Sequence, residues 1–174
     1  MFSSAGKVVR FPEDEVRPMG RQAKGVRGIT LQDGQSVVSL IIAGPADEQS
    51  TVLTATVNGY GKRTPLADYP KHHRGGQGVI SIQVSERNGA VVGAVLVDTR
   101  DEIMLISTGG VLIRTRVEDI REMGRSTQGV TLINLDDGTR LAGVEKVIES
   151  DSEADVDSDA ESAGEADAGD EGAE

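Results

Sequence analysis

Residues 63–79 read RTPLADYPKHHRGGQGV, and the same pattern of residue types occurs twice more in the chain. Residues 10–26 read RFPEDEVRPMGRQAKGV, and residues 114–130 read RTRVEDIREMGRSTQGV. All three fit R-x4-[DE]-[VYI]-x4-R-x2-[KQ]-G-V with identical internal spacing, and successive copies start 53 and 51 residues apart. So many matched positions at fixed offsets indicate an internal structural repeat.

The segments that flank each motif predict β-structure. Upstream lie FSSAGKVVRF, VLTATVNGYGKRT and IMLISTGGVLIRTRV, which are apolar or β-branched stretches broken by glycine, as in hairpins. Downstream, each copy continues as a strand, a turn and a second strand; the turns are Asp33-Gly34, Asn88-Gly89 and Asp137-Gly138. Two hairpins per copy make about four strands, the size of one propeller blade. We therefore expect an all-β, propeller-type fold of three four-stranded blades, roughly residues 1–50, 51–100 and 101–148.

Composition narrows the class of protein. The chain has no cysteine or tryptophan, two tyrosines, two phenylalanines and 22 glycines, so the core must be built from Val, Ile and Leu. Without cysteine there is no disulfide, thiol nucleophile or cysteine-based zinc site. The amino-terminal MFSSAGKVVRF has no apolar run typical of a signal peptide or membrane span, so we expect a cytoplasmic protein without a membrane partner.

The net charge of −11 is unevenly distributed. Residues 1–148 hold 18 Lys and Arg against 17 Asp and Glu, a net charge of +1, whereas residues 149–174 hold 12 acids and no Lys or Arg. The last 26 residues are mainly Asp, Glu, Ala, Ser and Gly, which cannot bury enough apolar surface to offset chain entropy. We expect a folded body that ends near Ile148 and a disordered acidic tail.

The stretch KHHRGGQG, residues 71–78, has three possible interpretations: a metal site, a phosphate-binding P-loop or a turn. His72 and His73 are the only histidines, adjacent side chains on an extended segment point apart, and the matching loops MGRQAKG and MGRSTQG have none, so we predict no metal site. A P-loop leads into a helix, but Gly78 is followed by the strand-like VISIQV. A glycine-rich turn remains, whose amides and arginine can approach an anion.

Long ordered stretches of this chain resemble the carboxy-terminal domain family of bacterial DNA gyrase A subunits. They are FSSAGKVVRF, EDEVRPMGRQAKGVRGI, TATVNGYGKRTPLADYP, QGVISIQVSERNGAVVGAVLVD and IRTRVEDIREMGRSTQGVTLI, followed by the acidic tail. The resemblance implies a six-bladed, strand-swapped propeller, or β-pinwheel, that bends duplex DNA around a basic rim. Three blades match the last half of such a domain. Where strands are swapped, we expect the first blade to lack the strand of a missing neighbour.

The resemblance also implies partners and chemistry that lie outside this chain. Gyrase uses ATP, with Mg²⁺, to introduce negative supercoils, and it combines a B subunit with the A subunit. Its breakage-reunion module, with the active-site tyrosine, lies upstream of this domain. Tyr60 and Tyr69 sit inside repeat elements, and Tyr69 aligns with Val16 and Ile120, which is typical of a core position. We therefore expect a fragment that has no catalytic residues and no cofactor of its own.

The family's box motif, Q-R-R-G-G-K-G, has a degenerate counterpart in residues 72–78. Arg74, Gly75, Gly76 and Gly78 match it, whereas His72, His73 and Gln77 depart from it and remove fixed positive charges or change a donor. These departures weaken the expectation that residues 72–78 perform the whole function of the box motif. We still place Gly75 and Gly76 among the DNA-binding residues because glycine lets backbone amides approach a phosphate closely.

The two arginine series of the repeat have different expected roles. The first has an acid five residues on in every copy, so we predict the ion pairs Arg10–Glu15, Arg63–Asp68 and Arg114–Asp119 in preference to DNA contact. The second lacks such a partner and lies in the glycine-containing loop, where the guanidinium suits phosphate binding. The predicted DNA-binding residues are Arg21, Lys24, Arg74, Gly75, Gly76 and Arg125, with Lys7, Arg27, Lys62 and Lys71 extending the rim.

Taken together, these features predict a module that binds duplex DNA through its backbone without reading bases. The shortage of aromatic side chains argues against single-strand binding, which depends on base stacking. Two alternatives stay open from the residues: the corresponding domain of topoisomerase IV, whose blades are fewer and more degenerate, and a propeller-like protein-interaction module. Salt-dependent DNA binding would separate the two DNA-binding domains, of gyrase and of topoisomerase IV, from the protein-interaction module.

Overall fold

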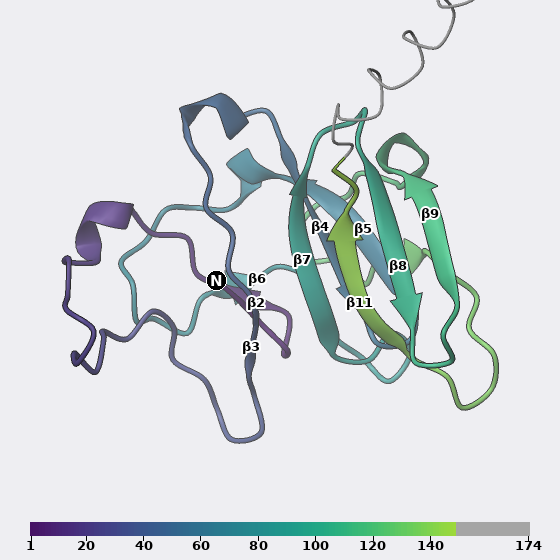
Figure 1. Cartoon of the computed structure of the whole chain (residues 1–174), viewed down its shortest axis with the longest axis horizontal. Helices are drawn as coiled ribbons and strands as arrows, with labels where there is room; N and C mark the ends of the chain where they lie inside the picture. The colour runs from purple at the N-terminus through teal and green to yellow at the C-terminus, as the bar shows by residue number, and fades with distance from the viewer. Residues whose placement is uncertain (149–174) are drawn as a thin grey trace, which may run out of the picture.

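The computed structural model describes residues 1–148, and the regular elements in that range are β-strands and short 3-10 turns (Figure 1). The strands are β1 (Phe2–Ser3), β2 (Lys7–Val8), β3 (Val37–Ser39), β4 (Thr51–Thr56), β5 (Tyr60–Pro65), β6 (Val79–Ile80), β7 (Val91–Val97), β8 (Glu102–Ser107), β9 (Leu112–Arg116), β10 (Val130–Thr131) and β11 (Leu141–Lys146). The 3-10 turns are η1 (Glu13–Glu15), η2 (Pro45–Asp47), η3 (Leu66–Asp68) and η4 (Val117–Asp119). The all-β prediction is confirmed; the predicted disordered tail lies outside the described residues.

Three antiparallel sheets follow one another along the chain. Their strand orders are β3-β1-β2-β6, β10-β5-β4-β7 and β11-β8-β9. Strand β6 comes from the second copy of the repeat but pairs with β2 of the first, with Val79 opposite Val8. Strand β10 comes from the third copy but pairs with β5 of the second, with Val130 opposite Gly61. Each of these two copies therefore completes the sheet of the copy before it.

This exchange corrects the prediction of two hairpins per copy. The upstream hairpin is confirmed in β4 and β5, which are joined through the tight turn at Gly59. The downstream hairpin is wrong, because β6 joins the first sheet whereas β7, beyond the turn at Asn88, pairs with β4 in the second sheet. Buried Asn88 holds this crossing by donating to the carbonyls of Gln83 and Gln128 at 2.9 and 3.0 Å. Turn residues specify that the chain reverses, not which strand it pairs with.

The position of the incomplete sheet was also predicted wrongly. The first sheet has four strands because β6 completes it, and the third sheet has three described strands with β9 at its edge. The exchange runs from each copy to the preceding one, so the expected strand is missing from the third sheet. The prediction of three four-stranded blades therefore holds for the first two sheets only.

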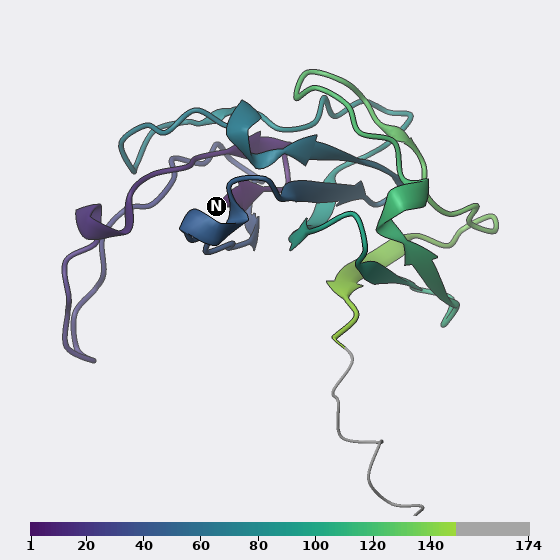
Figure 2. The same ribbon diagram turned by 90° about the horizontal axis from the view of Figure 1, so that it is seen from above.

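The core lies between the sheets, which pack face to face. Every residue of β4 is buried, because this strand has a neighbouring sheet on both sides. One cluster contains Phe2, Val8, Val52, Leu66, Tyr69 and Ala94 and joins the first two sheets. The other joins the second and third sheets through residues such as Leu53, Ala55, Ile103, Leu105 and Val117. Seen from above, the sheets follow an arc, as propeller blades do (Figure 2). The prediction of Tyr69 as a core residue is confirmed, with 2% of its surface exposed.

The first arginine of the motif joins neighbouring copies. Nη1 of Arg10 donates to the carbonyl oxygens of Leu66 and Tyr69, at 2.9 and 3.2 Å. Nε of Arg63 donates to the carbonyl oxygen of Ile120 at 2.7 Å, one copy further on. Tyr69 and Ile120 occupy equivalent motif positions, directly after η3 and η4. An arginine in one copy therefore binds the 3-10 turn of the next.

The predicted ion pairs within each copy are wrong as a consequence. The structure pairs Arg10 with Glu48 at 3.6 Å, Arg63 with Glu122 at 3.9 Å and Arg114 with Glu102, instead of with Glu15, Asp68 and Asp119. The five-residue spacing puts each acid in the 3-10 turn of its own copy, whereas Arg10 and Arg63 reach the turn of the following copy. Asp119 instead accepts from Arg116, three residues before it, at 3.2 Å.

A pair of glycine substitutions should measure how tightly the exchanged strand packs. Gly59 and Gly34 have the same left-handed backbone, with φ of 80° and 76°. A Cβ on Gly59 would lie 2.5 Å from the carbonyl oxygen of Ile133 in the donated segment, whereas one on Gly34 would meet no heavy atom within 4 Å. Both Ala variants lose about 1–2 kcal/mol through the left-handed conformation. We expect Gly59→Ala to lose about 1–3 kcal/mol more, as overpacking does, in urea denaturation. Equal losses would show that the segment around Ile133 moves to accommodate the added Cβ without loss of stability.

Candidate nucleic-acid interface

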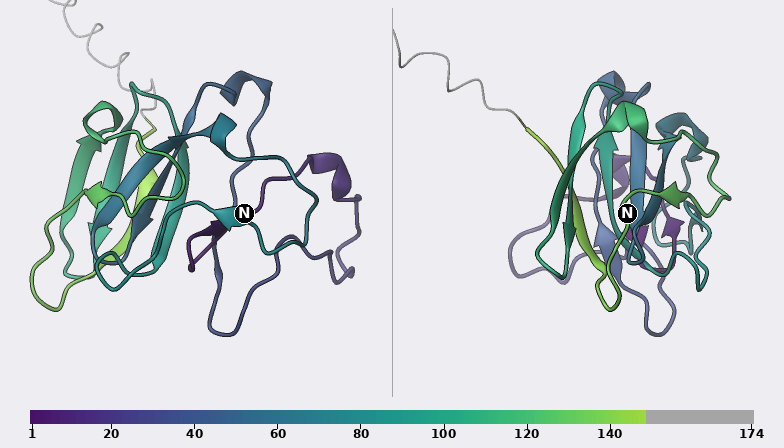
Figure 3. Two further views of the ribbon diagram at one scale, coloured as in Figure 1. Left: turned by 180° about the vertical axis from the view of Figure 1, so that it is seen from behind. Right: turned by 90° about the vertical axis from the view of Figure 1, so that its right-hand side faces the viewer.

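Loops from the three copies lie side by side. The loop of the second copy is hydrogen-bonded to the chain just beyond the first loop. The amide of Gly75 donates to the carbonyl of Gly28 at 2.6 Å, and the amide of Thr30 donates to the carbonyl of Gly76 at 2.8 Å. The third follows the second, because the amide of Gln83 donates to the carbonyl of Thr127 at 2.9 Å. Figure 3 shows the second loop, teal, meeting the chain where it leaves the first loop, purple, which extends beyond it. Residues 16–27, 70–78 and 120–130, which these bonds join at or just beyond their ends, are here together called the loop edge.

The loop edge concentrates the positive charge of the body. It contains eight basic residues, namely Arg17, Arg21, Lys24, Arg27, Lys71, Arg74, Arg121 and Arg125, against one acid, Glu122. The remainder of residues 1–148 has ten basic and 16 acidic residues, so a body of net charge +1 separates into about +7 and −6. Arg17 and Arg121 were not among the predicted DNA-binding residues. Their shared position, seven residues after the first motif arginine in copies one and three, is a signal that identifies them.

The second motif arginine binds one loop to the preceding loop. Arg74 donates from Nε to the carbonyl of Glu15 and from Nη1 to the carbonyl of Arg27, both at 3.0 Å. Arg125 makes the equivalent contact one copy later, from Nη1 to the carbonyl of Ile80 at 3.5 Å. Since a guanidinium has five N–H groups, these bonds leave others able to bind an anion. Arg74 and Arg125 are half-buried, whereas Arg21 is exposed.

The histidine-containing loop is held by one carboxylate. Glu15 Oε2 accepts from the amide of Arg74 at 2.9 Å, and Oε1 lies 2.8 Å from Nδ1 of His73. The hydrogen bond from Arg74, and then that from His73, hold the pKa of Glu15 below its usual value. Within residues 1–148, no cluster of three His, Cys, Asp or Glu side chains is placed to hold a metal. The carboxylate therefore fixes the backbone that carries the Arg-Gly-Gly sequence.

Lys62 is not a rim residue, contrary to the prediction. Its side chain is fully buried, and Nζ donates to the carbonyl oxygens of Gly124 and Arg125, the latter at 2.7 Å. Burial, and then the nearby Arg125 charge, lower the pKa of Lys62 to about 8. Lys62 lies in β5, and the alternation of side chains along that strand does not reveal that the loop of another copy covers this lysine. Its role is to anchor the third loop to the second sheet.

The other predicted contacts have mixed positions. Lys24, Arg27 and Lys71 are exposed on the loop edge, and Gly76 is exposed beside them. Lys7 lies in β2 and is half-buried. Gly75 has φ of 82°, but its amide already donates to Gly28, so this amide is not available to a phosphate. The prediction of Gly75 as a direct ligand is therefore wrong; it positions the loop instead.

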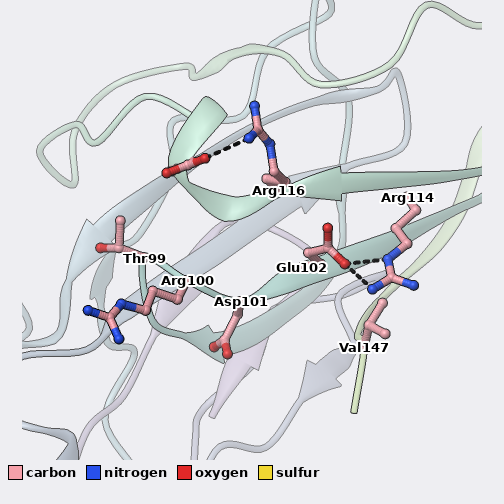
Figure 4. A pocket seen from close by; sticks show the side chains of 8 residues that line it. Thr99, Arg100, Asp101, Glu102, Arg114, Arg116 and Val147 are labelled. Atoms are coloured by element: carbon pink, nitrogen blue, oxygen red, sulfur yellow. Dashed lines mark hydrogen bonds and ion pairs between the residues drawn. The ribbon is translucent and has the colours of Figure 1, made fainter. Parts of the chain in front are cut away.

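A cleft of about 560 Å³ lies elsewhere, between β8, β9 and the end of β11 (Figure 4). Its lining residues are Thr99, Arg100, Asp101, Glu102, Arg114, Arg116, Glu118 and Val147. Its charges largely compensate one another: Glu102 binds Arg114, Glu118 lies 3.0 Å from Arg116, and Asp101 lies 2.6 Å from Lys146. This cleft lacks the charge excess of the loop edge.

Antiparallel blades packed face to face, with strands passed from one repeat to the preceding sheet, define a strand-exchanged β-propeller. The chain belongs to the family described as the DNA gyrase C-terminal domain, beta-propeller, which matches residues 1–43, 50–98 and 101–147. The resemblance noted in the sequence is thus confirmed. No helix in residues 1–148 is long and apolar enough to cross a membrane.

Relatives and solved structures agree with this assignment. The chain is 52% identical over 167 residues to the A subunit of DNA gyrase from Escherichia coli K12, covering 96% of this chain and 19% of the relative. It superposes on a structure of the DNA gyrase A C-terminal domain with a TM-score of 0.73 and 29% identity, covering 84% of this chain and 49% of that one. For the C-terminal domain of DNA topoisomerase IV the values are 0.76, 28%, 84% and 45%. The chain thus spans about a fifth of its curated relative, and the family match favours gyrase over topoisomerase IV.

The buried Lys62 predicts a specific pH dependence of stability. Its pKa is lower in the folded chain than in the unfolded chain, so between about pH 8 and the ordinary lysine value the unfolded chain binds more protons. The free energy of unfolding gains a rising contribution across this window, and the cost of burying the charge is fully present below it. We expect Lys62→Met to remove that rise, measured as the wild-type minus variant difference in urea denaturation. A pH-independent difference would contradict the lowered pKa.

Proposed function

We propose that residues 1–148 bind duplex DNA through its phosphate backbone and help to wrap it, as part of a gyrase A subunit. The observation that carries the proposal is the separation of charge: eight basic residues against one acid on three adjacent loops, in a body of net charge +1. Phosphate neutralisation by Lys and Arg is the main source of sequence-independent DNA affinity. A cationic edge repeated along an arc suits a bent duplex.

The composition of the edge favours backbone contact over base readout. Its arginines at positions 21, 74 and 125 recur in all three copies and those at 17 and 121 in two, and guanidinium groups donate well to phosphate oxygens. The described loops hold no Trp or Phe and no Tyr, so base stacking contributes little. Similarity to a gyrase A subunit supports the same role. A protein-interaction module would not need this charge separation.

The wider context of the proposal comes from the family. The chain would act in the cytoplasm, within an enzyme whose A and B subunits use ATP and Mg²⁺ to introduce negative supercoils. The residues on the loop edge would bind and orient DNA and perform no covalent chemistry. Catalysis would belong to other parts of that enzyme.

Three arginines test the proposal directly. We expect the triple substitution of Arg21, Arg74 and Arg125 by Ala to weaken DNA binding to a similar extent for unrelated duplex sequences, because phosphates are common to all. The slope of log affinity against log salt should flatten by up to about 2.7, since each lost phosphate contact removes roughly 0.9. Fluorescence anisotropy over a salt series measures both quantities.

A matched control separates this site from general charge. The triple substitution of Arg100, Arg116 and Arg140 by Ala removes the same charge outside the loop edge, and it should change the slope much less. Equal effects of the two triples would contradict the loop edge as the site. Absence of duplex binding by the unsubstituted chain at low salt would overturn the proposal and favour the protein-interaction module.

We expect the acidic residues 149–174, which lie outside the described part of the chain, to compete with DNA for the loop edge. They carry a charge of −12 on a 26-residue segment joined to the body, so their effective concentration near the loop edge is high. We expect removal of these residues to raise DNA affinity, most at low salt, because screening weakens electrostatic competition. The measurement is the same anisotropy series on both lengths. Equal affinities at low salt would leave only a solubility role for the acidic segment.

A further inference from the structure

A buried lysine holds the third loop of the loop edge. Lys62 lies in β5 with 0% of its surface exposed, and its Nζ donates to the carbonyl oxygens of Gly124 and Arg125, the latter at 2.7 Å. Carbonyl groups of the loop, and not a carboxylate, are thus its hydrogen-bond partners. Burying an ammonium group costs free energy unless such partners are present, so the lysine and the loop depend on each other.

The two residues that follow Lys62 bind the same loop. Thr64 donates from Oγ1 to the carbonyl of Met123 at 2.8 Å, and the amide of Met123 donates to the carbonyl of Arg63 at 2.9 Å. Nε of Arg63 donates to the carbonyl of Ile120 at 2.7 Å. Three consecutive residues of β5 therefore bind backbone groups along residues 120–125, and they fix the course of this part of the loop.

The fold does not require a lysine at this position. Val9 stands at the equivalent position of the first copy, one residue before its motif arginine, and is buried with 3% of its surface exposed. The amide of His72 donates to the carbonyl of Arg10 at 2.8 Å, which is the bond that Met123 makes one copy later. A valine is thus compatible with the same contact between copies, so the lysine gives the third loop a property that this contact does not need.

That property concerns the placement of Arg125. Lys62 binds its carbonyl, whereas within residues 1–148 its guanidinium makes one long hydrogen bond, from Nη1 to the carbonyl of Ile80 at 3.5 Å. Arg74, the equivalent residue of the second loop, uses two N–H groups on carbonyls at 3.0 Å. Arg125 therefore combines a fixed backbone with available donors, and an arginine placed in this way loses little entropy when it binds a phosphate.

The charge of Lys62 lies behind the same site. After burial, repulsion from Arg125 is the next cause that lowers the pKa of Lys62, so the two positive groups are close enough to interact. Like charges in a partly buried place interact more strongly than charges on an open surface, because water screens them less. A phosphate at Arg125 would reduce this repulsion without contacting Lys62.

We propose that Lys62 is a positioning residue for DNA binding, which holds Gly124 and Arg125 so that the Arg125 guanidinium meets a phosphate of the DNA backbone. Lys62 itself does not touch DNA, because its side chain is fully buried. The inference rests on the proposed function, and it makes one phosphate contact depend on a residue below the surface. A lysine that served stability alone would weaken the fold without acting through Arg125.

A double-mutant cycle, measured by anisotropy on the whole chain, separates these two roles. Arg125→Ala should lower duplex affinity by about eightfold in 0.1 M salt, the electrostatic value of one phosphate contact with a salt slope of roughly 0.9. Lys62→Met should cause a similar or smaller loss, and it should cause much less in a chain that already carries Arg125→Ala. As the matched control, Lys71→Met removes an exposed lysine of the loop edge and should lower affinity by the same factor in both backgrounds. Equal factors for Lys62→Met in the two backgrounds would overturn the inference.

Amide hydrogen exchange without DNA tests the hold on the loop itself. Lys62→Met should speed exchange at the amide of Met123 and leave that of His72, which makes the equivalent bond in the second loop, nearly unchanged. Thr64→Val removes only the Oγ1 bond to Met123, so it should give the same pattern, and the same coupling to Arg125, at smaller amplitude. Unchanged exchange at Met123 in both variants would overturn this inference alone. Absence of DNA binding by the unsubstituted chain would overturn the proposed function and this inference with it.

Discussion

The donation of a strand from one copy to the sheet of the preceding copy is the interaction on which the remainder of the structure depends. A blade built from its own copy alone would leave an unpaired row of backbone N–H and C=O groups. Strands β6 and β10 pair with those groups in the first two sheets. The bonds are between main chains, so they fix the translation and the angle between neighbouring blades more firmly than side-chain packing alone.

The loop edge is a consequence of this exchange. Each exchanged strand directly follows its loop, so pairing of β6 with β2 draws residues 70–78 against the loop of the first copy. The loops bring like charges together, which costs free energy. Backbone hydrogen bonds, the contacts of Arg74 with the carbonyls of Glu15 and Arg27, and the Glu15 carboxylate hold them in place. A polyanion such as DNA would lower this repulsion between the basic side chains of the loop edge.

Sequence reasoning found the features that depend on local chemistry. The repeat, the hairpin around Gly59 and the buried Tyr69 follow from spacing, turn residues and apolar alternation. It missed features that depend on which copy lies next to which. The partner of β6, the burial of Lys62 and the true partners of Arg10 all involve contacts between residues that lie far apart in the sequence, in different copies. Local patterns carry no information about such a choice of partner.

The motif itself explains why these misses have one origin. Its first arginine reaches the turn of the following copy, its second reaches the loop of the preceding copy, and its glycine packs against the preceding sheet. The repeated residues therefore encode the joint between two copies and not the interior of one. The spacing within the motif is equal because every contact between neighbouring copies has the same geometry. A partner that was predicted within one copy is therefore found in the neighbouring copy. A repeat motif in such an array is best interpreted first as an interface with its own neighbour.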